Sequence, residues 1–467
     1  MNSHLTIHRL AAKASFVLPL VLLSAFTAAA GDPPLDPRIL AEEEVYQFEP
    51  MDNGSGPMWC RGNTCIVRKG DIVAASGLET IQDASPLNNC LPLLFVREPQ
   101  GWRRVFRGEG RTREPGPLAV FQDGRIFYST NPTLTEPNAY NGPARPTVLE
   151  FDPGRFDQAP KVHLPQWAGE PPFSEHSYRT FVADGSRGEL FLLQNIGYAH
   201  AEWSFRDSQG KWSAQGQLKW PFEPDYSKPQ PVRLCYPAVA LQNRRVFFAG
   251  VSDIVEPYDE WREYKYEITG RKWDYDFRRL FFTWSDDITS GQFHDWIEIS
   301  SRDATAGWIT PWDLYVHPGG DIFVLWTERA LDERLRAKFF PDAKQRYSLE
   351  LAVLRGGEIK QRTAILEGGE GLSDIQPGGA RLHVSSDGRL FVIYYASGVK
   401  EGERFASNFI AEIDAGGAIG QSHKVSFEIP FQNFFTNTIR AGNPPSNSID
   451  LLGQHGQTMR YGRVKLY

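Results

Sequence analysis

Residues 176–200, HSYRTFVADGSRGELFLLQNIGYAH, contain two apolar runs joined by a polar turn. The pair Asp184-Gly185 lies at that turn, and Asp-Gly between apolar runs is a strong signal of a β-hairpin. A histidine stands at each end of the stretch, His176 before the first run and His200 after the second. The stretch therefore predicts a hairpin that carries two histidines to the same end.

The same plan recurs along the chain, which indicates a repeat rather than one isolated hairpin. Seven hairpins are expected, and the first apolar residues after their turns are Ile72, Ile126, Leu190, Val246, Ile322, Leu390 and Met459. The steps between them range from 54 to 76 residues. Strand-rich repeats of this size are typical of propeller blades with four strands each. The sequence therefore predicts an all-β, seven-bladed β-propeller, with six or eight blades as the alternatives.

Segments outside the hairpins complete the expected fold. Residues 459–467, MRYGRVKLY, are expected to close the ring beside an N-terminal strand, because closure removes exposed sheet edges. Residues 327–340, TERALDERLRAKFF, have apolar residues at helical spacing and predict a short surface helix. We expect residues 131–146 to form a proline-rich loop, residues 252–261 a solvated loop, and residues 273–284 a buried outer strand pair.

The N-terminus has the features of a signal peptide that is removed on export. Arg9 and Lys13 precede an apolar stretch, residues 14–28, and small residues follow it before Gly31. The stretch is short for a membrane span. We therefore expect residues 1–30 to be a leader and residues 31–467 a single propeller domain. The product would be a secreted or periplasmic monomer that does not insert into the membrane.

Charge and composition limit the partners. Without the two basic leader residues the formal charge falls by two, from −7 to −9, so nucleic acid is not an expected partner. A polyanionic substrate would need a locally basic cleft. Aromatic residues make up 13% of the chain, with thirteen Trp. Flat rings pack against the C–H faces of sugars, but a large all-β core also needs aromatic residues, so composition leaves both readings open.

The four cysteines suggest a disulfide and no metal site. An exported protein can form disulfides, and Cys60 is a plausible partner for Cys65 or Cys90, whereas Cys235 is expected to be a buried free thiol. Their spacing does not resemble a zinc site. We therefore expect no metal ligand and no cofactor at the functional site, and a structural calcium ion stays open.

Propeller geometry converts the hairpins into a set of candidate site residues. The innermost strand of each blade lines the central channel, so its first residues converge at one mouth, together with the end of the second strand. The inner-strand candidates are His176, Tyr178, Arg233, Tyr236, Trp312, Asp313, Arg381 and Asn447. The second-strand candidates are Asn195, His200, Asp253 and Glu328.

Histidine and tyrosine at one mouth suit β-elimination at a uronic acid. Histidine titrates near neutral pH, and a neutral tyrosine can donate a proton. A base removes the proton on C5, an acid protonates the leaving oxygen on C4, and a cation or amide must hold the carboxylate. We expect His176, His200 and Tyr236 to be catalytic. Those expected to bind substrate are Arg233, Arg381, Trp312, Asn195 and Asp253.

Two stretches resemble a known family. Residues 283–296, TWSDDITSGQFHDW, resemble a degenerate aspartate box of BNR-repeat, sialidase-like propellers, where the motif forms a turn between two outer strands. Residues 176–296 are similar to BNR-type propellers that include ulvan lyases, which cleave a sulfated, uronate-containing algal polysaccharide. The resemblance implies seven blades and a catalytic role for His176, His200 and Tyr236.

One departure from that family affects the carboxylate-binding role. The family places an arginine at the end of the second strand after the tyrosine, where this chain has Ser252 and Asp253. The resemblance therefore implies an exported polysaccharide lyase without assigning its carboxylate-binding residue.

Two alternative functions remain. A sialidase-like glycoside hydrolase would use Arg233, Arg381 and Arg440 with Tyr236 and Asp313, and a general hydrolase would draw a carboxylate pair from Asp253, Asp313 and Glu328. The third reading is a non-catalytic carbohydrate-binding propeller.

Overall fold

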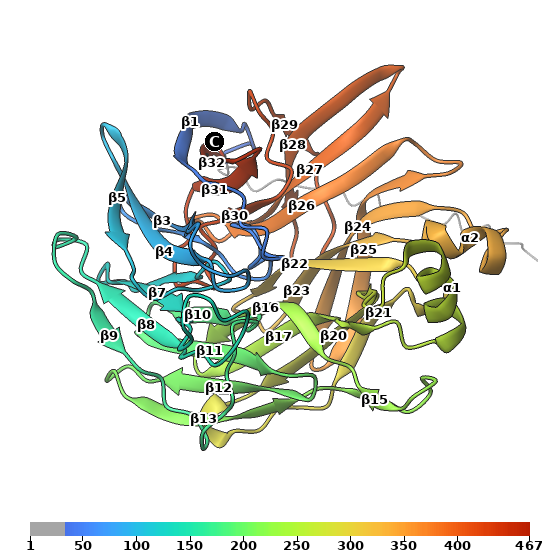
Figure 1. Ribbon diagram of the computed structural model, residues 1–467. Coiled ribbons are helices and arrows are strands. Elements are labelled where there is room, and N and C mark those ends of the chain that lie inside the picture. The colour runs from blue at the N-terminus through green and yellow to red at the C-terminus, as the bar shows by residue number, and fades with distance from the viewer. Residues whose placement is uncertain (1–32) are drawn as a thin grey trace, which may run out of the picture. The chain divides into compact units, whose positions relative to one another are not determined.

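Seven antiparallel sheets of four strands follow one another along the chain and form a seven-bladed β-propeller, as the sequence predicts (Figure 1). The computed structural model describes residues 33–467, and residues 35–467 form one unit. The predicted leader, residues 1–30, lies outside the described residues. Within the described part of the chain, no helix is long and apolar enough to cross a membrane.

The first three blades follow directly from the predicted hairpins. Blade 1 contains β2 (Ile66–Lys69), β3 (Ile72–Thr80), β4 (Cys90–Glu98) and β5 (Gly101–Arg107). Blade 2 contains β6 (Leu118–Val120), β7 (Ile126–Thr130), β8 (Thr147–Phe151) and β9 (Lys161–His163). Blade 3 contains β10 (Thr180–Asp184), β11 (Glu189–Ile196), β12 (His200–Arg206) and β13 (Trp212–Lys219).

The next three blades keep the same order from the innermost to the outermost strand. Blade 4 contains β16 (Leu234–Gln242), β17 (Arg245–Ser252), β20 (Arg279–Ser285) and β21 (Ile297–Ser301). Blade 5 contains β22 (Trp308–Val316), β23 (Ile322–Arg329), β24 (Arg346–Arg355) and β25 (Glu358–Gly369). Blade 6 contains β26 (Ile375–Val384), β27 (Leu390–Lys400), β28 (Glu403–Ile413) and β29 (His423–Val425).

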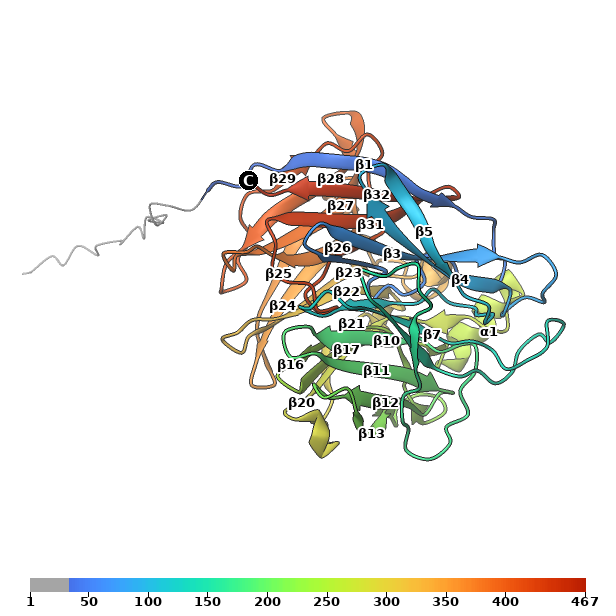
Figure 2. The same ribbon diagram turned by 90° about the vertical axis from the view of Figure 1, so that its left-hand side faces the viewer.

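Blade 7 closes the ring with strands from both ends of the described chain. It contains β30 (Phe434–Thr436), β31 (Ser448–His455), β32 (Thr458–Lys465) and β1 (Arg38–Gln47). β1 pairs antiparallel with β32, from Arg38 opposite Lys465 to Gln47 opposite Thr458, and Figure 2 shows the two strands side by side. The predicted closure is confirmed.

The last hairpin differs from its prediction in one respect. It supplies the second and third strands of blade 7, because the three-residue strand β30 is the innermost one. Asn447 therefore precedes a second strand and lies at the opposite end of the blade from the inner-strand starts. Its side-chain oxygen accepts a hydrogen bond from the backbone of Ser386, in the β26–β27 turn. Asn447 is thus wrongly placed among the candidates at the mouth.

Elements outside the blades include two helices and two short strand pairs. They are α1 (Asp259–Thr269), α2 (Glu333–Phe339), β14 (Phe222–Glu223) with β15 (Gln230–Pro231), and β18 (Ile254–Val255) with β19 (Tyr275–Asp276). Two single 3₁₀ turns are η1 (Ile288–Ser290) and η2 (Asp303–Thr305). The predicted helix is confirmed in α2, and η1 lies between β20 and β21, where the resemblance places an aspartate box. Asp287 caps η1 by accepting from the Thr289 backbone.

Two expectations about buried groups are wrong. The segment 252–261 is not a solvated loop, since Asp253 and Glu256 are buried and α1 begins within it. All four cysteines are buried free thiols, so the expected Cys60 disulfide is absent from the structure. The Cys60 thiol donates instead to the Pro115 carbonyl, 2.9 Å away, which satisfies it in the core.

Apolar side chains between neighbouring blades form the core and fix which way each strand face points. Leu190 and Leu192 of β11 pack with Phe121 and Phe127 on the side of blade 2. The alternate residues of β11 pack with blade 4 instead. Each fully buried side chain of this kind contributes roughly 1.5–3 kcal/mol to folding. Side chains alternate between the two faces of a strand. A polar residue near the end of a strand therefore points to the same neighbouring blade as the apolar residues two and four positions away.

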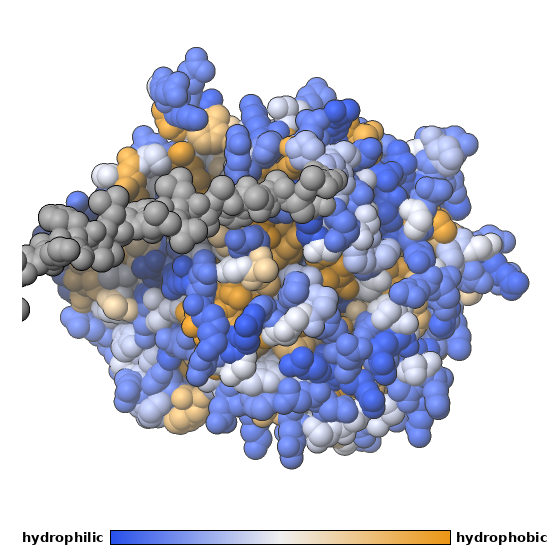
Figure 3. Space-filling view, turned by 180° about the vertical axis from the view of Figure 1, so that it is seen from behind, coloured by the Kyte–Doolittle hydropathy of each residue, from blue (hydrophilic) through white to orange (hydrophobic). Residues whose placement is uncertain are grey.

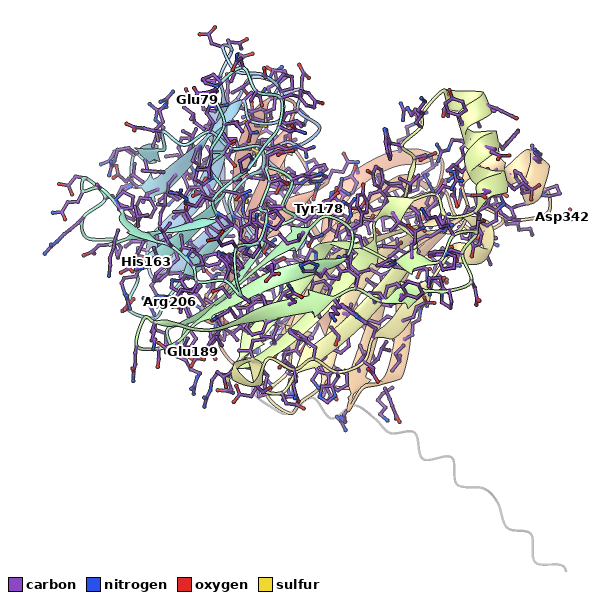
Figure 4. The ribbon with its side chains drawn as sticks, turned by 60° about the horizontal axis from the view of Figure 1, so that its bottom comes forward. Glu79, His163, Tyr178, Glu189, Arg206 and Asp342 are labelled. Carbon is purple, nitrogen blue, oxygen red and sulfur yellow. The ribbon has the colours of Figure 1, made fainter. Side chains whose placement is uncertain are left out.

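The surface contrasts with this core. Hydrophilic side chains cover most of the face seen from behind, and hydrophobic residues show between them in smaller groups (Figure 3). The side chains of Glu79 and Asp342 lie out toward the periphery, whereas Tyr178 lies toward the middle of the molecule (Figure 4).

Candidate active site

A segment from outside the blades crosses the channel mouth to which the inner-strand starts converge. This plug segment, residues 59–64, belongs to the connection between β1 and β2. The Asn63 amide donates to the Arg179 carbonyl and accepts from the Phe181 backbone, at 2.7 and 2.9 Å. A Cβ atom on Gly62 would lie 2.0 Å from the carbonyl oxygen of Pro237. The mouth is therefore closed over the channel, and its surface is built partly by the plug segment.

Four aromatic side chains cluster at the mouth beside the plug segment. His176 and Tyr178 precede β10, Tyr236 lies in β16, and Trp59 belongs to the plug segment. Their ring centroids are 4.6 Å apart for His176 and Tyr178, 5.2 Å for Tyr178 and Tyr236, and 5.5 Å for Trp59 and Tyr236. We call Trp59, His176, Tyr178 and Tyr236 the aromatic mouth. The sequence correctly places His176 and Tyr236 in one cluster.

Two residues of the aromatic mouth have strained backbones. Tyr178 has a φ of 43° and Tyr236 a φ of 48°, in the left-handed region that bulky side chains rarely adopt. At Tyr236 the strain accompanies a shift in the pairing of β16 with β17, between Cys235 and Ala238. Such strain costs on the order of 1–3 kcal/mol per residue and concentrates at functional sites. The two phenol rings meet edge to face at the mouth.

The imidazole of His176 is neutral and can accept a proton. Burial is the main cause that lowers its pKa from 6.5 to about 3, and the charges of Arg113 and Arg233 add to the effect. Its Nε2 atom is buried and has no hydrogen-bond partner among the described residues. The imidazole is therefore in the neutral form that catalysis by a general base requires.

Tyr236 has the opposite property. Burial is the main cause that raises its pKa well above 10, and Arg61 opposes that shift. The hydroxyl is therefore protonated at any ordinary pH and can act as a proton donor. Tyr236 is half-buried, whereas Tyr178 beside it is only 7% exposed and has its own pKa raised by burial. Tyr236 is thus the tyrosine of the pair that a substrate can reach.

Arg233 and Asp253 neutralise each other at the edge of the aromatic mouth. The guanidinium lies 2.7 Å from the carboxylate, and its Nε donates to the Asp253 carbonyl at 3.0 Å. The same guanidinium lies 3.9 Å from the ring centroid of Tyr198. Asp253 is 1% exposed, and burial raises its pKa against the effect of Arg233. The structure brings both predicted residues to the mouth, but as a buried ion pair.

Two further arginines at the mouth have no acidic partner within the described part of the chain. The Arg61 guanidinium lies 5.4 Å from the ring centroid of Tyr236, and that of Arg113 lies 5.7 Å from that of Trp59. Among residues 33–467, Arg113 donates to the carbonyl of Asn53, at 3.1 Å. The mouth therefore carries uncompensated positive charge on a chain whose net charge is −7.

Sequence reasoning missed Arg61 and Arg113 because it considered only strand ends of the hairpins. Arg61 belongs to the plug segment, and Arg113 to the connection between β5 and β6. The one signal near Arg61 is the compact stretch CRGNTC, whose glycine permits the close contact with Pro237.

His200 is not part of the aromatic mouth. It begins the third strand of blade 3, β12, and stands opposite Ile196, the last residue of β11. It shares a sheet face with Leu190 and Leu192, which pack toward blade 2, whereas Tyr236 packs with the core between blades 4 and 5. Its Nε2 lies 3.1 Å from Glu202. The catalytic role of His200 stays a prediction that this placement does not favour.

Three predicted substrate-binding residues are buried beneath or beside the mouth. Arg381 is 1% exposed and donates to the carbonyls of Trp312 and Arg61, so it supports the plug segment from below. Trp312 packs in the core between blades 5 and 6. Asn195 is buried and donates to the Leu234 carbonyl at 2.9 Å. The structure does not bring these three residues to the surface of the mouth.

The remaining hydrolase candidates are also buried. Asp313 is 1% exposed and pairs with Arg440 at 2.6 Å, and Arg440 donates to the Gly62 carbonyl of the plug segment. Glu328 is 3% exposed and accepts from Arg362 at 2.8 Å. With Asp253, each of the three carboxylates that the sequence nominates is buried and paired with an arginine.

Comparisons with known proteins give structural likenesses at about 10% sequence identity. No family model and no curated protein matches the chain. The chain is similar to a solved structure of unknown function from Dyadobacter fermentans, with 10% identity, coverage of 92% of this chain and 99% of the other, and a TM-score of 0.42. It is also similar to the β-propeller domain of the trilobed protease from Pyrococcus furiosus (10% identity, 86% and 94% coverage, TM-score 0.43). A third similar structure is the α-L-arabinanase of Penicillium chrysogenum complexed with arabinobiose. The identity is 10%, the coverage is 92% of this chain and 99% of the other, and the TM-score is 0.38.

Proposed function

We propose that the protein is an exported polysaccharide lyase that cleaves a uronic-acid-containing polymer, of the ulvan type, by β-elimination. The observation that carries the proposal is the pairing of an unpartnered neutral His176 with a protonated Tyr236 in an aromatic mouth that Arg61 and Arg113 make positive. Aromatic rings suit sugar faces, and uncompensated arginines suit carboxylate or sulfate groups.

Four residues at the mouth carry the steps of this reaction. Arg61 and Arg113 hold the uronate carboxylate and stabilise the charge that develops on it. The imidazole of His176 takes the proton from C5, and the electron pair of that bond forms the C4=C5 double bond. The C4–O bond breaks, and the Tyr236 hydroxyl protonates the leaving oxygen. The proton then returns from His176 to Tyr236 through solvent, and no water is consumed.

The predicted leader fits this function. A polysaccharide is too large to enter a cell intact, so an enzyme that cleaves it must act outside the cytoplasm. The residues that carry the signal, Arg9 and the apolar stretch 14–28, fit export followed by cleavage before Gly31.

Hydrolysis is the weaker alternative on the geometry of the mouth. Hydrolases of both stereochemical classes need two carboxyl groups flanking the scissile bond, with water admitted to one of them in the inverting class. Asp253, Asp313 and Glu328 are instead buried and held by arginines. A binding protein without activity would retain sugar affinity after both catalytic side chains are removed.

The test is the ultraviolet absorbance of the unsaturated uronate that elimination leaves. The protein starting at Gly31 is incubated with ulvan, polygalacturonate, polyglucuronate and alginate, alongside His176→Ala and Tyr236→Phe variants. Matched controls are His423→Ala on the outermost strand β29 and Tyr266→Phe, whose ring is 47% exposed on α1. We expect absorbance to rise with the parent and both controls and to be lost in both mouth variants. New reducing ends without absorbance would instead establish a hydrolase.

A further inference from the structure

A groove lies between blades 4 and 5, beside the aromatic mouth. It has a volume of about 490 Å³. Its lining consists of three aromatic residues, three arginines and three carboxylates: Tyr275, Phe277, Trp308, Arg271, Arg329, Arg334, Asp274, Asp332 and Glu333. Trp308 begins β22 and Arg329 ends β23, and the two residues stand opposite each other in the sheet. Both positions lie at the end of blade 5 where the inner strand starts, so the groove opens on the same face as the mouth.

Aromatic rings connect the groove to the mouth without a break. Tyr236 stacks with Phe277 at a centroid distance of 6.0 Å, and Phe277 lies 4.6 Å from Trp308. Phe277 and Trp308 are both half-buried, so part of each side chain is exposed. The Trp308 Nε1 donates to Thr310 at 3.1 Å, which fixes the orientation of the indole. A linear molecule leaving Tyr236 in this direction meets two further rings.

The groove is lined by three arginines and three carboxylates, and Arg329 is the arginine that faces Trp308. Asp274 and Asp332 are both held by Arg334, each at 2.6 Å. Arg329 lies 5.8 Å from the ring centroid of Trp308 and has no acidic partner in the part of the chain that the structure describes. Its Nε is buried and makes no hydrogen bond there. Because no carboxylate of the described residues pairs with it, the guanidinium can pair with an anion that enters the groove.

We propose that this groove, with Trp308 and Arg329, is a binding site for a second anionic sugar of the same polysaccharide chain that the aromatic mouth cleaves. The inference rests on the proposed function, because the mouth defines where the chain enters. Trp308 supports the apolar face of the sugar ring, and Arg329 pairs with its carboxylate or sulfate. The protein would then require a substrate longer than the two sugars that flank the scissile bond.

The test is a measurement of binding rather than of turnover. Oligoglucuronates of two and six sugars are titrated calorimetrically into the His176→Ala protein, which is expected not to cleave them. Cellohexaose serves as the uncharged chain of the same linkage. Adding Trp308→Ala should weaken binding of the six-sugar oligoglucuronate about tenfold, which is the size of one lost aromatic contact. Binding of the two-sugar oligoglucuronate should not change. Arg329→Gln should weaken binding of the six-sugar oligoglucuronate by a similar factor and leave binding of cellohexaose unchanged.

Matched substitutions at the far end of blade 4 serve as controls. Trp284 is a half-buried tryptophan near the end of β20, and Arg245 begins β17. Trp284→Ala and Arg245→Gln should bind every chain as the parent does. If Trp308→Ala disturbs folding, Arg329→Gln still tests whether the groove binds the anionic group of the sugar.

Different results would refute the proposal for the groove and the proposal for the mouth. Equal hexamer affinity in Trp308→Ala, Arg329→Gln and the two controls would overturn the groove, as would no oligoglucuronate binding by the His176→Ala protein. In either case the absorbance test of the mouth would be unaffected. Conversely, chain-length-dependent binding without any unsaturated product would retain the groove and refute the lyase.

Discussion

The chemistry of the mouth depends on the protonation of one histidine. The pKa of His176 is about 3 rather than 6.5, mainly because the ring is buried and also because Arg113 and Arg233 repel a proton. A base with that pKa stays neutral as the pH falls from neutrality through 6.5. We predict that kcat/KM on a uronate polymer shows no acid limb near pH 6.5, measured with a substrate whose carboxylates stay ionised.

The Arg113→Ala variant tests the cause of that shift. Removing the guanidinium relieves part of the repulsion, so the pKa of His176 rises and any acid limb moves to higher pH. An acid limb at about 6.5 in the parent that Arg113→Ala leaves unmoved would contradict the role of His176.

Individual site residues were only partly predictable from the sequence. His176, Tyr236, Arg233 and Asp253 follow from hairpin geometry, because the ends of strands converge whatever the connections do. The role of Arg381 could not be inferred, since its partners include the Arg61 carbonyl, 320 positions away in sequence. Sequence spacing shows which strand end a side chain occupies but not which distant segment lies over it.

At the scale of elements, the plug segment determines the shape of the mouth. Gly62 lies against the Pro237 carbonyl, which belongs to the strained stretch of β16. An added methyl group has no space there and must move backbone. We predict that Gly62→Ala lowers the free energy of unfolding by about 1–3 kcal/mol, measured by urea denaturation.

Gly56→Ala is the matched control for that change, because a Cβ atom there would meet nothing within 4 Å. Its unfolding midpoint should equal that of the parent. Equal stability of both glycine variants would show that the plug segment is not tightly held.

A buried charge network connects α1 to blade 4 and gives a second prediction at this scale. Burial is the main cause that raises the pKa of Asp276 from 3.8 to about 7, with Glu256 and Asp303 adding and Arg278 and Lys265 opposing. Because the folded state binds this proton more tightly, stability from Asp276 is greatest at low pH and is lost as the pH rises from about 4 to 7.

The Asp276→Asn variant should lack this component of pH dependence. The component amounts to at most roughly 4 kcal/mol between the two limits. It is measured as the difference in unfolding free energy between parent and variant at pH 5 and at pH 8. A difference that does not change with pH would contradict the raised pKa.

Elements with strong turns were predictable, and weak ones were not. Asp-Gly and Gly-Gly turns predict their hairpins directly from the sequence, whereas β30 has three residues and no turn of its own. The segment 252–261 is polar in sequence, yet Glu256 is buried because Arg278 and Lys265 surround its carboxylate. A polar composition therefore does not distinguish a solvated loop from a buried ion network.

At the scale of the whole molecule, β1 holds the ring closed. It is the outermost strand of blade 7, and its loss would leave β32 as an unpaired edge. We predict that a chain starting after residue 47 unfolds at a lower temperature than one starting at Gly31 and associates through its open edge. Scanning calorimetry and size-exclusion chromatography measure the two effects. Equal melting temperatures and monomeric elution of both chains would contradict this view of closure.

The central claim is that the mouth performs elimination, and one digest tests it directly. Ulvan, or whichever uronate polymer of the panel is cleaved, is incubated with the protein starting at Gly31. New reducing ends and ultraviolet absorbance are then counted in the same sample. Elimination by His176 and Tyr236 predicts one unsaturated uronate for every new reducing end, and neither product with Tyr236→Phe. Reducing ends that appear without unsaturated uronate would contradict the account.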